Sequence, residues 1–126
     1  MKLPTVQKWF NLYIRLKKSD ENGTCRCVTC NKLFYYKEGD AGHYIPSTKT
    51  IHRFNEDNVH PQCISCNRFK SMGSEYTLWM IDNYSREFVD ELHATANTPF
   101  PISLPKRKEL SKHYRALCRE LEKGKQ

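Results

Sequence analysis

The sequence lacks any long apolar run. No stretch approaches the roughly 18 consecutive apolar residues that a membrane-spanning helix requires, and the opening Met-Lys-Leu-Pro-Thr-Val-Gln-Lys lacks the apolar core of a secretory signal. We therefore expect no membrane association and a protein that is made and kept in the cytoplasm. In that reducing compartment, paired cysteines more often bind metal or carry out redox chemistry than form structural disulfides.

Acidic residues are missing from one end of the chain and scarce at the other. Residues 1–18 carry five Lys or Arg and no acid, and residues 106–126 carry eight against three acids, within a net charge of +7. Basic ends of this kind predict contacts with a polyanion, although solvated helical faces are the plain alternative. The residues expected to contact nucleic acid are Lys8, Arg15, Lys17, Lys18, Arg68, Lys70, Lys106, Arg107 and Lys108.

The 126 residues suffice for one domain, and a hydrophobic content of 38% gives a modest core that a structural metal would help to stabilise. Apolar periodicity predicts helices over 5–18, 74–84 and 85–96, and a C-terminal helix with an apolar stripe. Short strands are expected at 33–36, 42–45 and 51–54, with an opening helical turn at 66–70. Three prolines predict an extended linker over 98–105.

Six cysteines include two Cys-x-x-Cys pairs, and apart from this doubled motif the chain shows no internal repeat. Cys27, Cys30, Cys63 and Cys66 supply the four soft ligands of a closed tetrahedral zinc site. The 32 residues between the pairs leave room for a hairpin whose ends the ion would clamp together. Cys25 could replace Cys27, but its one-residue spacing suits a shared ion poorly. We therefore expect Cys25 to be a small buried residue, and Cys118 likewise.

Three polar residues are candidates for catalysis. His43 follows Asp-Ala-Gly on an expected strand within the segment that zinc would close, and a neutral imidazole there could take a proton from water. Asn67 follows Cys66, the last cysteine of the second pair, and its amide oxygen could coordinate a hard cation such as magnesium or simply cap a helix. Asn58 could stabilise its own loop through backbone hydrogen bonds.

The spacing of these motifs resembles a known nuclease family. Residues 42–46, Gly-His-Tyr-Ile-Pro, and residues 58–70, which run from Asn-Val-His-Pro-Gln-Cys to Cys-Asn-Arg-Phe-Lys, resemble the HNH branch of the ββα-metal (His-Me finger) nucleases. More closely, Cys-Arg-Cys-Val-Thr-Cys, then Ala-Gly-His-Tyr, then Arg-Phe-Asn-Glu-Asp-Asn-Val-His-Pro-Gln-Cys is similar to the phage NinG proteins, also called Rap. The match runs from about Trp9 to Lys70.

The resemblance implies a recombination endonuclease that cuts branched DNA, such as Holliday junctions and D-loops, and leaves 5′-phosphate and 3′-hydroxyl ends. By position, His43 corresponds to the base that activates water, Asn58 to the asparagine that fixes the loop, and Asn67 to the ligand of Mg²⁺ or Mn²⁺. Many HNH enzymes carry an aspartate directly before the histidine, where this chain has Gly42. Asn67 would then hold the cation nearly alone, with His60 or Asp57 as helpers, and His60 could equally contact a phosphate.

The expected fold is α+β: a small zinc-stapled ββα-metal finger flanked by N-terminal and C-terminal helices. Residues 1–97 would form the HNH-like domain with its N-terminal helix, and residues 98–126 a proline-rich linker and basic helix belonging to the same domain or extending it. Paired cuts across a junction would be natural for a symmetric homodimer, although a monomer is equally compatible. Recombination proteins are candidate partners. Trp9, Tyr44 or Phe69 could stack on exposed bases or belong to the scaffold.

Two rival functions remain open at this point. The first is a non-catalytic zinc module that binds DNA or a recombination protein, which would need the cysteines and the basic ends but not His43. The second is an adaptor that binds protein through the stripe Leu110, Tyr114, Leu117 and Leu121. Cleavage of a junction by the wild type, and its loss in a His43 variant, would separate the enzyme from both.

Overall fold

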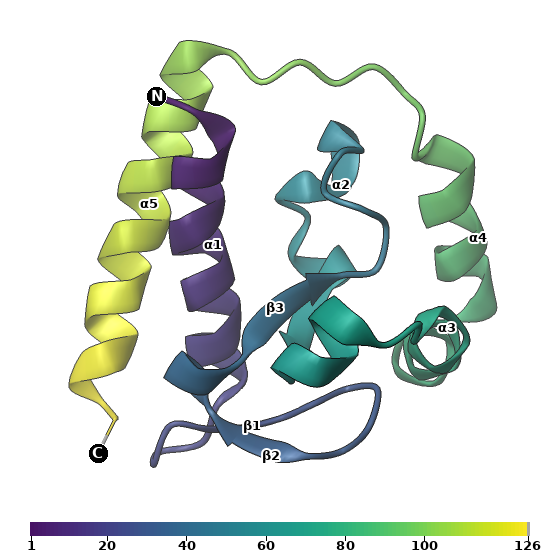
Figure 1. Cartoon of the computed structure of the whole chain (residues 1–126). Helices are drawn as coiled ribbons and strands as arrows, with labels where there is room; N and C mark the ends of the chain where they lie inside the picture. Colours follow the sequence, from purple (N-terminus) through teal and green to yellow (C-terminus); the bar gives the residue numbers. More distant parts are fainter. Residues whose placement is uncertain (126) are drawn as a thin grey trace.

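The computed structural model describes residues 1–125, so the last residue of the expected 98–126 segment lies outside the described part. It combines five α-helices with two two-stranded antiparallel sheets, β1–β2 and β3–β4, and this mixture is compatible with the expected α+β class. Figure 1 shows helices α1 and α5 side by side at one edge and helices α3 and α4 at the other, with the sheets between them. No helix in residues 1–125 is long and apolar enough to span a bilayer.

Helix α1 (Leu3–Lys18) confirms the first expected helix and begins two residues earlier. Pro4 suits its first turn, where the missing N–H costs nothing, and three basic residues in the last turn favour the negative end of the helix dipole. Val6, Phe10 and Ile14 are buried at helical spacing. The helix therefore presents one apolar face to the core and its lysines to solvent.

Helix α5 (Leu104–Lys123) covers α1 along its length. Figure 1 shows the two helices running in the same direction. Arg107 donates to the carbonyl of Met1 at one end, and Lys125 donates to the carbonyl of Ser19 at the other. The stripe Leu110, Tyr114, Leu117 and Leu121 packs into the core clusters that α1 shares. This stripe is therefore occupied within the chain, which removes the basis for an adaptor that binds protein through it.

The first sheet holds the cysteine loops in place. Strand β1 (Thr24–Arg26) pairs with β2 (Leu33–Tyr35), which confirms the strand expected near 33–36. Between them a turn carries Cys27 and Cys30, and Cys27 N–H donates to the carbonyl of Lys32 at 2.8 Å. A 3-10 helix, η1 (Tyr36–Glu38), then leads into β3.

The second sheet corrects two expectations. Strand β3 (Asp40–His43) begins two residues before the predicted strand at 42–45, and its partner is β4 (Val59–Gln62), a segment for which no strand was expected. The predicted strand at 51–54 is instead helix α2 (Thr50–Arg53), followed by the 3-10 helix η2 (Glu56–Asn58). One helical turn separates Ile51 from Phe54, so both line the same apolar cavity, and tertiary packing overrides their preference for strands.

Pro61 concealed strand β4 from sequence reasoning, because proline cannot donate to a sheet ladder. Here it lies opposite Ala41, and its carbonyl accepts from Val28 N–H at 3.0 Å. A two-stranded sheet offers such edge positions, so the proline is tolerated. The strand delivers Cys63 directly to the cysteine loop of the first sheet.

After β4, the chain makes one π-helical turn, η3 (Ser65–Phe69), at the place where an opening helical turn was expected over 66–70. Lys70 N–H closes this wide turn by donating to the carbonyl of Ser65 at 3.0 Å. Helices α3 (Gly73–Asn83) and α4 (Arg86–Thr95) then confirm the two predicted helices. The extended segment that follows crosses the top of the molecule to α5 (Figure 1) and ends at Ser103, whose side chain caps α5 by accepting from Lys106 N–H.

Candidate functional site

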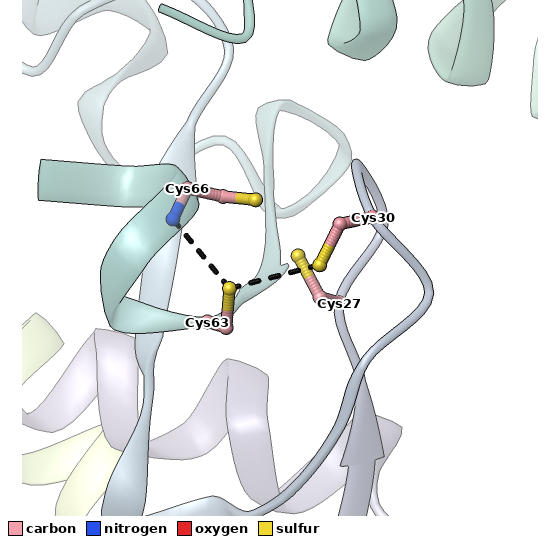
Figure 2. A group of neighbouring side chains, drawn as sticks. All are labelled: Cys27, Cys30, Cys63 and Cys66. Atoms are coloured by element: carbon pink, nitrogen blue, oxygen red, sulfur yellow. Dashed lines mark hydrogen bonds between the residues drawn. The ribbon is translucent and has the colours of Figure 1, made fainter. Parts of the chain in front are cut away.

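The four paired cysteines converge from two loops. Figure 2 shows Cys27 and Cys30 on the turn after β1 facing Cys63 and Cys66 at the end of β4 and in η3. Their four sulfur atoms all lie within 4.8 Å of one another, and the Cys30 and Cys63 sulfurs are 3.7 Å apart. A tetrahedral site with Zn–S bonds of about 2.3 Å needs sulfur separations of roughly 3.8 Å. The cluster therefore fits a structural metal such as zinc.

Hydrogen bonds favour the thiolate form of Cys27, which is the form that binds a metal cation. Burial raises the pKa of the Cys27 thiol, but the Thr29 hydroxyl, 3.4 Å from its sulfur, and nearby backbone N–H groups outweigh this and lower the pKa to about 6. Cys66 N–H donates to the Cys63 sulfur at 3.5 Å. Metal ligands must be thiolates, and Cys27 favours that form. Burial raises the pKa of Cys30 and raises that of Cys66 to about 12, so these two thiols would release their protons when a metal binds.

The two remaining cysteines are buried apart from this cluster. The Cys25 thiol donates to the carbonyl of Arg15 at 3.2 Å, and the Cys118 thiol donates to the carbonyl of Trp9 at 3.4 Å. Burial raises the pKa of each to about 11. Both are thus neutral thiols in the core, and the structure places Cys27 rather than Cys25 in the metal cluster.

His43 ends strand β3 and is held by one hydrogen bond. Its Nε2 lies 2.8 Å from the carbonyl oxygen of Arg53, in helix α2. Burial lowers the pKa of the imidazole below 6.5, the Arg53 carbonyl opposes this shift, and the Arg53 charge adds to it. The ring is therefore neutral at pH 7. Because a carbonyl can only accept, Nε2 carries the hydrogen and Nδ1 keeps the lone pair.

His43 and Asn67 line one polar cavity of about 480 Å³, although 23 residues separate them in the sequence. Helix α1 forms one wall, strand β3 another, and η3 the third. The lining residues are Gln7, Asn11, Arg15, Asp40, Ala41, His43, Pro46, Ser47, Asn67 and Arg68. The cavity thus joins a neutral imidazole, amide oxygens and two guanidinium groups beside the cysteine cluster.

Asp40 organises the η3 side of the cavity. Its carboxylate accepts from Asn67 Nδ2 at 3.0 Å and from the Arg68 guanidinium at 2.8 and 2.9 Å. Burial raises the pKa of Asp40, but these hydrogen bonds and the positive charges of Arg68 and Arg15 outweigh it, so the pKa falls below its ordinary value. Because Nδ2 donates to Asp40, the amide oxygen of Asn67 points away from Asp40. In that orientation the oxygen can accept a cation.

Asn58 is fully buried and stabilises the loop between β3 and β4. Its Oδ1 accepts from Ile45 N–H at 2.8 Å, and its Nδ2 donates to the carbonyls of Ile45 and His52 at 3.0 and 3.2 Å. These contacts place Asn58 in the scaffold rather than in the cavity. Its geometry is that of a loop-fixing residue.

Neither His60 nor Asp57 lines the cavity that contains Asn67. The His60 ring packs 4.6 Å from Trp79, donates from Nε2 to the Asp57 carbonyl at 2.9 Å, and lines a separate cavity. Burial lowers the pKa of His60 to about 4. The Asp57 carboxylate accepts from the Tyr84 hydroxyl at 3.3 Å. The structure does not bring either side chain together with Asn67 as a second ligand.

The basic residues expected to contact nucleic acid differ in their exposure and in whether they already have a partner within the chain. Arg15 is half-buried and donates to the Tyr36 carbonyl at 2.7 Å, yet it lines the cavity. Ion pairs join Lys17 to Glu56, Arg68 to Asp40 and Lys106 to Glu109, while Arg107 donates to the Ile102 carbonyl. Lys8, Lys18, Lys70 and Lys108 are exposed. Of the aromatic candidates for stacking, Phe69 is 80% exposed, whereas Trp9 and Tyr44 pack against the core clusters.

Sequence reasoning missed Asp40, which lines the cavity, and Gln62, whose amide oxygen lies beside Gly42. Asp40 was seen only as part of a motif, and Gln62 was not singled out at all. Strand β4 pairs Gln62 with Asp40, so the side-chain alternation of that pairing would have placed them together. Because 59–62 was not expected to be a strand, this signal was not used.

Comparisons with known proteins show which family the chain belongs to. The family model described as Bacteriophage Lambda NinG protein matches residues 3–125. This chain belongs to the NinG family. Protein ninG of Escherichia phage lambda is 34% identical over 94 residues, which cover 73% of this chain and 44% of that protein. Protein ninG of Salmonella phage P22 is 32% identical over 91 residues, covering 71% and 42%.

The chain thus spans less than half the length of the curated NinG relatives that it matches. A further relative, protein ninG of Escherichia phage 933W, is 33% identical over the same share of the chain, 73%. No solved structure matches the chain significantly.

Proposed function

We propose that this NinG-family protein is a metal-dependent endonuclease of the HNH (ββα-metal) type that hydrolyses phosphodiester bonds in branched DNA. The observation that carries the proposal is the shared polar cavity, in which His43 and Asn67 lie with Arg15 beside a four-cysteine cluster. Strands β3 and β4 with the turn η3 would be the finger, and zinc on the cysteines would hold it closed. The products would be 5′-phosphate and 3′-hydroxyl ends.

His43 would act as the general base. The Arg53 carbonyl fixes its tautomer and orientation through Nε2, so Nδ1 is the atom that takes a proton from the attacking water. Its lowered pKa keeps Nδ1 unprotonated at neutral pH. General-base catalysis of this kind contributes about 10²- to 10⁴-fold to rate.

Asn67 would hold Mg²⁺ or Mn²⁺ through its amide oxygen, a hard ligand that suits these ions. When bound, the cation would stabilise the negative charge that develops on the phosphate and the departing oxygen. Asp40 keeps the amide oriented by accepting from Nδ2. Four thiolates would leave the zinc no open position, so zinc would take no part in the reaction.

Arg15 would bind the phosphate. Its guanidinium stays charged even though burial lowers its pKa, and the Tyr36 carbonyl fixes its Nε. Arg68 faces the same cavity, but its charge is already met by Asp40. Arg15 therefore carries the positive charge that is available to a substrate inside the cavity.

The substrate class rests on the family resemblance and the charge distribution. The exposed lysines at both ends of the chain would contact phosphates without reading sequence. Contacts with recombination proteins, a homodimer and a place of action in the host cytoplasm belong to the same proposal. The alternative is a zinc-containing module that binds DNA or a recombination protein without cutting.

Cleavage of a labelled four-way junction and a matched linear duplex, with and without Mg²⁺, tests the proposal. The wild type is expected to cut the junction with Mg²⁺ and to leave ends that DNA ligase can reseal. His43→Ala should lose at least a hundredfold of the rate while still binding the junction. The matched control is His113→Ala, which removes an exposed histidine of α5 and should cut normally.

Two outcomes would overturn the proposed endonuclease activity. Unchanged cleavage by His43→Ala would remove the proposed base. Tight binding of the junction without cleavage in either Mg²⁺ or Mn²⁺ would establish the non-catalytic alternative.

A further inference from the structure

The space beside Gly42 is already filled by another side chain. A Cβ atom added to Gly42 would lie 1.7 Å from Oε1 of Gln62 and 3.1 Å from Oδ1 of Asn67. Two side-chain amide oxygens thus border the point where a residue other than glycine would begin its side chain. Position 42 is where many HNH enzymes carry an aspartate, so the Gln62 oxygen stands where a carboxylate side chain would start.

Gln62 is held firmly in this orientation. The side chain is 4% exposed, and its Nε2 donates to the Thr29 hydroxyl at 3.1 Å. The Thr29 oxygen is also 3.4 Å from the Cys27 sulfur. A thiolate can only accept, so the hydroxyl donates to Cys27 and its oxygen accepts from Gln62. This arrangement assigns the amide nitrogen to Thr29 and leaves Oε1 for the Gly42 side.

Asn67 is oriented from the other side in the same way. Asp40 accepts from its Nδ2, which leaves Oδ1 near the Gly42 position. Both amides therefore donate to fixed partners and turn their oxygens toward a common place. Amide oxygens are hard, neutral ligands that suit Mg²⁺ and Mn²⁺ and repel neither cation.

We propose that Gln62 is the second side-chain ligand of the divalent cation, acting with Asn67 in place of the missing aspartate, and that Thr29 positions it from the zinc cluster. This inference rests on the proposed metal-dependent function. It replaces His60 and Asp57, which lie elsewhere, as the partner of Asn67. Two neutral ligands predict weaker cation binding than an aspartate would give, and a larger share of the coordination by water.

Direct measurement of Mn²⁺ binding tests the inference without any cleavage assay. Free Mn²⁺ is followed by electron paramagnetic resonance as it is titrated into zinc-loaded protein. Gln62→Met keeps the side-chain volume and removes the oxygen, and it should weaken Mn²⁺ binding by about tenfold or more, the loss typical when a metal site loses a supporting group. Asn67→Ala should weaken binding at least as much. Asn83→Ala, which removes an exposed amide of α3, should leave it unchanged.

Two more variants keep the test decisive. Gln62→Glu preserves an oxygen at the same place and adds a negative charge, so it should bind Mn²⁺ more tightly than wild type. Thr29→Val removes the hydroxyl that positions Gln62 and should weaken binding by several-fold. Zinc content and thermal unfolding are measured for each variant. If Gln62→Met fails to fold with zinc, the Mn²⁺ affinity of Gln62→Glu decides whether Gln62 is a ligand.

The outcomes separate this inference from the proposed function. Wild-type Mn²⁺ affinity in a zinc-loaded Gln62→Met protein, or no tightening in Gln62→Glu, would overturn the role of Gln62 and leave Asn67 and His43 in place. A wild-type protein that binds no Mn²⁺ even with DNA would overturn both the metal-dependent function and this ligand.

Discussion

Nε2 of His43 lies 2.8 Å from the carbonyl oxygen of Arg53. This contact joins the end of strand β3 to helix α2, the segment whose helical form differs from the sequence expectation. Were residues 51–54 extended, that carbonyl would point elsewhere and the imidazole would lose its anchor. The helical turn of α2 therefore determines which nitrogen of His43 is available for chemistry.

Cleavage should depend on pH through His43. The base works only when Nδ1 is unprotonated, so the rate should be level above the pKa of His43 and fall about tenfold per pH unit below it. Because burial lowers this pKa from 6.5, the midpoint should lie below pH 6.5. The measurement is kcat/KM for junction cleavage from pH 5 to 8.5, with junction binding measured at each pH. A midpoint above 7 would contradict the buried-imidazole assignment.

Removal of zinc should unfold the protein. Structural zinc contributes roughly 10–16 kcal/mol of apparent binding energy in small domains, and here it links the β1 loop to the end of β4. We expect one zinc per chain by elemental analysis and loss of the circular dichroism signal on chelation. Cys63→Ser should abolish zinc binding. Cys118→Ser, at a buried cysteine outside the cluster, should retain the full zinc content, and a loss there would show that the cluster is wrongly assigned.

Replacement of Asn58 should destabilise the fold without touching the cavity. Asn58→Ala removes hydrogen bonds to three buried backbone groups, and unsatisfied buried groups of this kind cost about 2–4 kcal/mol together. Urea unfolding measures the change. Asn83→Ala, at an exposed amide, should stay within about 0.5 kcal/mol of wild type. An Asn58→Ala protein of normal stability that cannot cut would instead place Asn58 in the chemistry.

His60 should make stability fall in mild acid. Its folded pKa of about 4 lies below the unfolded value of 6.5, so the unfolded state binds a proton between these values while the folded state does not. The stabilisation is complete above pH 6.5 and is lost as pH falls toward 4. At pH 5.5 wild type should have lost about 1.4 kcal/mol more than His60→Phe, relative to pH 8. Equal losses measured by urea unfolding would show that His60 is already protonated in the fold.

DNA binding should weaken steeply with salt. If five or six lysines and arginines contact phosphates, the logarithm of the binding constant should fall with the logarithm of salt concentration with a slope of roughly −5. Changing exposed Lys8 and Lys108 together to Gln should reduce the slope by about two. Fluorescence anisotropy of a labelled junction gives both values. A slope near zero would remove the basic ends from the interface.

The longer helices and the cysteine cluster were within reach of sequence reasoning, whereas strand β4 and its pairing with β3 were not. The apolar spacing in α1, α3 and α4 has a period that few other structures produce, and Cys-x-x-Cys pairs constrain their own geometry. Strand β4 is four residues long and contains Pro61, so no local pattern marked it. Its existence depends on pairing with β3, a tertiary contact.

The residues of the candidate site likewise include some that the sequence predicted and one that it did not. His43 and Asn67 were found from their neighbours in the sequence, and the structure places them around one cavity. Gln62 could not be found by composition or spacing, because its proposed role depends on the missing side chain at Gly42 and on the short strand that pairs with β3. A single polar residue in a short strand carries no periodic signal of its own. Their roles depend on which backbone they face.

The parallel pairing of α1 with α5 affects when the cavity can form. Gln7, Asn11 and Arg15 line the cavity from α1, and the core clusters that α1 shares with α5 are completed only when Tyr114 and Cys118 arrive. Contacts between segments so far apart in the chain raise the contact order and slow folding. During synthesis, the polar wall of the cavity would therefore be secured only after the α5 segment has left the ribosome, which delays assembly of the site until translation of that segment is finished.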